Sequence, residues 1–106
     1  MKPIYGARSA AVAGLLVLCQ TAFAHAPILD CFFEQDMVKC EAGFSDGSSA
    51  AGRKVQVRDT NSKVLLEGVL DKTHSYLFKP PTRNYSVVFL GGDGHDVTIH
   101  SSDIAR

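Results

Sequence analysis

Histidines and cysteines are the residues of this chain whose side chains best suit transition metals. They are His25, His74, His95, His100, Cys19, Cys31 and Cys40. His25 has a special position because it follows Ala22-Phe23-Ala24, whose small residues at −3 and −1 are what signal peptidase needs. After cleavage there, His25 is the first residue, and it offers its α-amine and its ring nitrogen to the same ion. An internal histidine cannot form that chelate ring.

The chemistry of such a site follows from its nitrogen donors. The α-amine titrates near ~8, so a metal displaces its proton at moderate cost at neutral pH. Nitrogen donors of this kind suit Ni(II), Co(II) and Cu(II). Pro27 has no amide hydrogen, so deprotonated backbone amides cannot wrap the ion beyond Ala26. Further ligands must come from across the fold, and His95, His100, Asp96 and His74 are the candidates.

The same residues also allow a chain that binds no metal. Chain termini are usually disordered, which would leave His25 unused. The ordinary role of His95 is to end a glycine turn, and that of His100 is to lie on the solvated face of a strand. The sequence leaves both readings open.

Cys31 and Cys40 are predicted to form a structural disulfide. If residues 29–41 fold as a hairpin with the two-residue turn Gln35-Asp36, Cys31 falls directly opposite Cys40. That pair is of the non-hydrogen-bonded type, in which the Cα atoms approach most closely, within disulfide range. No Cys-x-x-Cys or nearby histidine completes a zinc or copper site on these thiols.

Residues 1–24 have the three parts of a secretory signal. Lys2 and Arg8 give a positive start, residues 10–19 form an apolar core too short to span a bilayer, and a cleavage site follows. We therefore expect a periplasmic protein whose mature chain is a single domain over residues 25–106 and does not insert into the membrane. The precursor is formally neutral, so loss of two basic residues leaves a weakly acidic domain. Such a domain is a poor partner for nucleic acid.

The mature chain reads as short strands joined by turns. After the hairpin, strands are expected at 54–58, at 63–70 with a bulge or kink at Gly68, at 76–79, at 85–90 as a central strand, and at 95–100. Six to seven short strands predict an all-β fold, a small antiparallel β-sandwich. On the last strand Val97 and Ile99 should face the core with His95 at its rim, whereas Asp96, Thr98 and His100 take the other face.

No catalytic machinery is visible in the sequence, so we expect a protein that is not an enzyme. No serine stands in a Gly-x-Ser-x-Gly elbow, and no glycine loop has phosphate-binding spacing. The paired carboxylates Asp93 and Asp96 flank a glycine turn, where polar turn chemistry accounts for them.

Three segments carry a resemblance to a known family. Residues 40–47, the block Val55-Gln56-Val57-Arg58-Asp59, and residues 66–81 are similar to small periplasmic domains of the carboxypeptidase-regulatory-like, transthyretin-like type. The strand 85–89 with Gly91-Gly92-Asp93-Gly94-His95 resembles the end of small accessory proteins of bacterial nickel and cobalt uptake systems. The resemblance covers roughly residues 40–104. The turn 71–74 departs from it, because it lacks the Asp-x-x-Gly that this family usually shows.

The resemblance implies a non-enzymatic accessory protein of nickel or cobalt uptake, with a membrane metal permease as partner. The donor chemistry of the residues adds copper as a further ion and makes His25 and His95 the best candidate ligands, with His100 as a further one. The alternative is an extracytoplasmic interaction module without bound metal, which docks through loops or an edge strand with Phe44 and Tyr76 as anchors. The ion, the partner and the oligomeric state stay open.

Overall fold

The structure is a computed structural model that describes residues 26–92 and 94–106. The expected signal peptide (1–24), His25 and Asp93 lie outside the described residues. Seven strands form the fold: β1 (Pro27–Glu34), β2 (Met37–Phe44), β3 (Lys54–Arg58), β4 (Val64–Val69), β5 (Ser75–Phe78), β6 (Ser86–Leu90) and β7 (Asp96–His100). A 3-10 turn, η1 (Ser101–Asp103), follows β7, and no α-helix occurs among the described residues.

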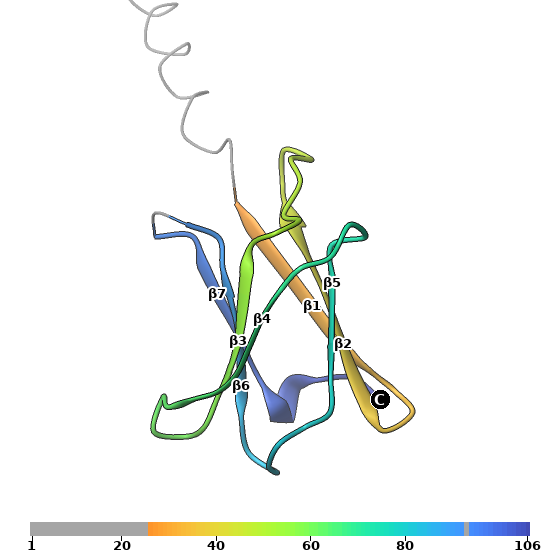
Figure 1. Cartoon of the computed structure of the whole chain (residues 1–106), viewed down its shortest axis with the longest axis vertical. Coiled ribbons are helices and arrows are strands. Elements are labelled where there is room, and N and C mark those ends of the chain that lie inside the picture. Colours follow the sequence, from red (N-terminus) through yellow and green to blue (C-terminus); the bar gives the residue numbers. More distant parts are fainter. Residues whose placement is uncertain (1–25, 93) are drawn as a thin grey trace, which may run out of the picture.

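The strands make two antiparallel sheets, ordered β1-β2-β5 and β4-β3-β6-β7. Figure 1 shows them as two layers, with β1 of one sheet beside β7 of the other. The predicted all-β fold of six to seven strands is therefore confirmed, with seven strands in two antiparallel sheets. The expected central strand is also confirmed, because β6 lies between β3 and β7.

The hairpin of β1 and β2 has the predicted register. Glu34 pairs with Met37 across a two-residue turn, and Cys31 pairs with Cys40. Gln35 adopts a left-handed φ of 60°, a conformation that tight hairpin turns require. The predicted disulfide joins the two cysteines, whose Cα atoms are 4.1 Å apart.

The core lies between the layers and follows from strand alternation. Val55, Val57, Val87 and Phe89 of the central strands β3 and β6 are fully buried, at 0 % exposure. The predicted alternation along β7 is confirmed as well. Val97 and Ile99 are half-buried, whereas Asp96, Thr98 and His100 are exposed.

The prediction of a bulge at Gly68 is wrong. Gly68 pairs regularly with Val55, and the register shifts instead where Val57 pairs with Leu66 and Arg58 with Val64. Leu65 is thus the extra residue. Gly68 has a different reason to be glycine, because a Cβ there would overlap the ring of Tyr76 on β5.

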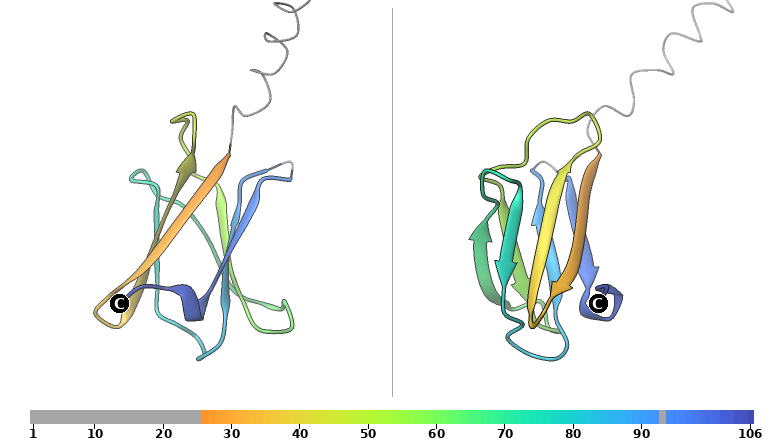
Figure 2. Two further views of the ribbon diagram at one scale, coloured as in Figure 1. Left: turned by 180° about the vertical axis from the view of Figure 1, so that it is seen from behind. Right: turned by 90° about the vertical axis from the view of Figure 1, so that its right-hand side faces the viewer.

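Two ends of the fold matter for function. One end, here called the amino-terminal end, holds the start of β1 and the connections 45–53, 70–74 and 91–95 (Figures 1 and 2). The opposite end, called the carboxy-terminal end, holds the connections 35–36, 59–63 and 79–85 and the final segment 101–106. The last segment crosses from one sheet to the other, since Phe33 of β1 donates its N–H to the Ala105 carbonyl at 2.8 Å. No described helix is long and apolar enough to cross a membrane.

Candidate functional site

The start of β1, which follows His25, is held firmly at the amino-terminal end. The Ala26 N–H donates to Ser45 Oγ at 3.0 Å, and the Ser45 N–H donates to the Ala26 carbonyl at 2.8 Å. His25 itself lies outside the described residues. The residue that follows it, Ala26, is tied to the 45–53 loop.

His95 lies at the same end, in the glycine turn that leads into β7. Its Nδ1 is 2.8 Å from the carbonyl of Gly92, which can only accept, so Nδ1 carries the hydrogen. Nε2 is then the ring atom with a free lone pair. Metal-binding histidines typically donate their second ring N–H to a carbonyl or carboxylate in this way. Gly91 permits the turn, because a Cβ there would overlap the backbone of His95.

His74 also lies at the amino-terminal end, in the turn between β4 and β5. Its φ of 62° is left-handed, the conformation that glycine adopts most readily. His74 therefore stands at a turn position whose backbone conformation favours glycine. Its Nε2 is 3.0 Å from Ser49 Oγ, and its carbonyl accepts from the Ala42 N–H at 3.0 Å.

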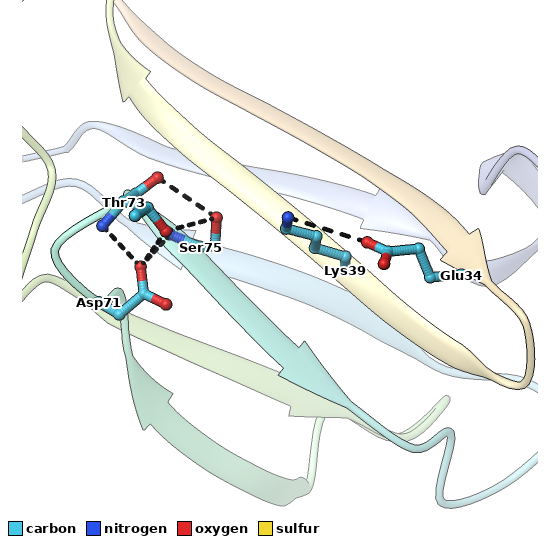
Figure 3. Close-up of polar contacts among 5 residues, drawn as sticks. All are labelled: Glu34, Lys39, Asp71, Thr73 and Ser75. Carbon is cyan, nitrogen blue, oxygen red and sulfur yellow. Dashed lines mark hydrogen bonds and ion pairs between the residues drawn. The ribbon is translucent and has the colours of Figure 1, made fainter.

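Asp71 organises that turn, as Figure 3 shows. Its Oδ1 accepts from the N–H of Thr73 at 2.8 Å, the hydroxyl of Thr73 at 2.7 Å and the N–H of Ser75 at 3.0 Å. The Thr73 hydroxyl, then the Ser75 amide, lower the pKa of Asp71 below its usual value of 3.8. The Asp71 carboxylate therefore stabilises the turn by accepting these three hydrogen bonds.

His100 lies at the carboxy-terminal end, away from His74 and His95. It ends β7, points to the outer face, and its Nδ1 is 2.9 Å from Ser86 Oγ. Five residues of extended chain separate it from His95, or about 16 Å at ~3.3 Å per residue. The structure therefore does not bring His95 and His100 together, and Asp96 shares a face with His100 only.

No group of three or more histidine, cysteine or acidic side chains is placed to hold a metal within residues 26–92 and 94–106. Cys31 and Cys40 are consumed by the disulfide. A set of three or more such ligands that includes His95 must therefore draw on residues outside the described part of the chain, such as His25 or Asp93, or on a partner.

One pair of facing carboxylates was not predicted from the sequence. Asp30 and Glu41 face each other across β1 and β2 and line a shallow pocket of about 330 Å³ with His74 and Ile28. The hairpin register contained the signal, because counting outward from the turn places residues 30 and 41 opposite each other. This pocket adds carboxylate oxygens to the amino-terminal end.

The aromatic anchors proposed for a docking surface are partly buried. Phe44 packs on Phe89 and Tyr76 on Phe78, each with ring centroids 5.7 Å apart. Among the described residues the exposed large apolar side chains are instead Ile28, Val64, Val69 and Leu77, between 43 % and 56 % exposed. Val64, Val69 and Leu77 belong to β4 and β5, which are edge strands of the two sheets.

Comparisons of this chain with protein-family models, with curated proteins and with solved structures find no match.

Proposed function

We propose that this chain is a non-enzymatic, periplasmic β-sandwich domain of the transthyretin-like type that handles a transition-metal ion at its amino-terminal end. One observation carries the proposal. His95, with Nε2 left free by the Nδ1–H bond to the Gly92 carbonyl, directly precedes β7. The start of β7 lies at the same end of the fold as the start of β1, which follows His25 by two residues (Figure 1). The disulfide supports an oxidising compartment, in keeping with the signal-like residues 1–24.

In this proposal the processed amino terminus supplies two donors. The His25 α-amine and ring form a chelate, and His95 Nε2 adds a third nitrogen from the 91–95 turn. Ni(II), Co(II) and Cu(II) suit such a nitrogen-rich set. The binding partner is a membrane metal permease that receives the ion. His100 has no part in the site, because it lies at the opposite end of β7.

The matched pair His95→Gln and His100→Gln tests the site. Both residues flank or end β7, and each Nδ1 has one hydrogen-bond partner. Titration of the processed protein with Ni(II) should show binding weakened at least about tenfold by His95→Gln and unchanged within about twofold by His100→Gln. Equal losses in the two variants would argue against an amino-terminal site.

The second candidate is an interaction module without metal. It is favoured by the exposed apolar side chains Val64 and Val69 on edge strand β4 and Leu77 on edge strand β5. An edge strand can accept an extended segment of a partner as an added strand. Metal binding that is weak in the parent protein and unchanged in both histidine variants would favour this candidate.

A further inference from the structure

A second pocket lies at the carboxy-terminal end, far from the histidine turns. It is enclosed by the end of β1, the segment between β5 and β6, and the segment after β7. Its volume of about 450 Å³ is within the range of small-molecule sites. Its polar lining residues are Thr82, Arg83, Ser101, Ser102 and Arg106, and its apolar ones are Phe33, Pro80, Tyr85 and Ile104.

The charged side chains of this lining are all basic. Arg83 and Arg106 line the pocket, and no aspartate or glutamate does. Among the described residues neither arginine takes part in an ion pair. Unpaired guanidinium groups with hydroxyls beside them suit a carboxylate, which accepts two parallel N–H bonds from one arginine.

Arg106 is held in place without using its hydrogen-bond donors. Its guanidinium lies 4.1 Å from the centroid of the Phe33 ring, and the bond from Phe33 N–H to the Ala105 carbonyl fixes the backbone beside it. Stacking occupies the face of the guanidinium and leaves its N–H edge free. Burial raises the pKa of Tyr85, and the charge of Arg106 opposes that rise, so the positive charge of Arg106 acts on a residue that lines the pocket.

Arg83 is positioned from the other side of the pocket. The Ser101 hydroxyl accepts from the Tyr85 N–H at 3.2 Å and lies 3.4 Å from the Arg83 carbonyl, to which it donates. The Ser101 N–H also donates to the Tyr85 carbonyl at 2.8 Å. The chain around Arg83 is therefore tied to η1, and the two arginines come from segments that the fold brings together.

We propose that this pocket binds a small organic carboxylate with an apolar body. The carboxylate lies between Arg83 and Arg106, where Thr82 and Ser102 add hydroxyl donors, and the apolar body lies against Pro80 and Ile104. The apolar half of the lining distinguishes this ligand from a bare inorganic oxyanion. The inference is independent of the metal site at the opposite end.

Benzoate is the probe, with benzamide as its uncharged counterpart and inorganic phosphate as the bare anion. An amide NMR titration of the processed protein should give saturable benzoate shifts centred on Tyr85, Ser101 and Ser102, and much weaker ones with the other two compounds. Arg83→Gln and Arg106→Gln should each weaken benzoate binding at least about fivefold. Arg53→Gln should leave it within about twofold.

Arg53 is the matched control because it also lies over a phenylalanine ring, that of Phe44 at 5.7 Å, but at the amino-terminal end. If Arg106→Gln fails to fold, Arg83→Gln alone decides, since the Arg83 side chain makes no hydrogen bond, ion pair or ring contact among the described residues. The proposal is overturned if benzoate gives no saturable shifts, if benzamide or phosphate binds as well, or if Arg53→Gln matches the loss.

Discussion

The ring of Tyr76 on β5 packs directly against the backbone of Gly68 on β4, although the two strands belong to different sheets. A Cβ at position 68 would overlap Cε1 of the ring and lie 3.0 Å from Cδ1 and Cζ. Tyr76 also lies 5.7 Å from the Phe78 ring, so its ring closes the side of the core where β4 and β5 meet. The missing side chain at Gly68 makes that closure possible.

Gly68→Ala should therefore lower the free energy of unfolding by about 1–3 kcal/mol, the usual cost of overpacking. Gly43→Ala is the matched control, because Gly43 also lies in a strand and a Cβ there meets nothing within 4 Å. That control should stay within about 0.5 kcal/mol of the parent or gain slightly. Urea unfolding measures both. A Gly68→Ala protein as stable as the Gly43→Ala protein would contradict the packing role of Tyr76.

Removal of the disulfide by Cys31→Ala with Cys40→Ala should cost about 2–3 kcal/mol. The bond closes a loop with a sequence separation of 9, and in the chain-entropy account a loop of this size contributes roughly that much. Both cysteines are buried in the core, so lost packing adds to the effect. Denaturant unfolding of the parent and the double variant gives the difference. Equal midpoints would mean that the bond is not needed to hold the hairpin.

Asp71 should make stability depend on acidic pH. Its folded pKa lies below 3.8, mainly because of the Thr73 hydroxyl, so its contribution is present above that value and is lost as the pH falls through the folded pKa. Asp71→Asn should flatten the acid side of a melting-temperature profile relative to the parent. Carboxyl NMR titration reads the pKa of Asp71 directly. A value above 3.8 would contradict the assigned turn.

Tyr85 should make the stability of the fold decrease at alkaline pH. Burial raises its pKa above 10.0, so its contribution to stability is full below that value and is lost as the pH rises through the folded pKa. Its buried hydroxyl has no hydrogen-bond partner among the described residues. Tyr85→Phe should therefore raise the free energy of unfolding by about 1 kcal/mol and weaken the alkaline loss.

Tyr85→Leu is the control for the ring, because it also removes the edge-to-face contact with Phe78 at 5.8 Å. That variant should be less stable than the parent. If Tyr85→Phe proves as destabilising as Tyr85→Leu, the hydroxyl has a partner after all.

Local patterns in the sequence predicted local features well. Counting from the Gln35-Asp36 turn placed Cys31 opposite Cys40, and alternation placed His100 on the outer face of β7. The reason for Gly68 was missed, because the ring that needs its space comes from another sheet. No local signal could reveal that contact.

The place of His74 was beyond local patterns too. The strand predicted over 95–100 already separates His95 from His100, whereas His74 joins the amino-terminal end through strand order. The carboxy-terminal pocket is likewise assembled from three separate segments. Such proximity depends on topology, which periodicity does not specify.

The central claim is that the processed amino terminus and His95 hold a metal ion. Isothermal titration of the protein beginning at His25 with Ni(II), Co(II) and Cu(II), beside a form with one extra amino-terminal alanine, tests it most directly. The extra residue moves the α-amine away from the His25 ring and removes the chelate. We predict tight binding to the first form and loss of that binding in the second. No binding, or binding indifferent to the added alanine, would contradict the claim.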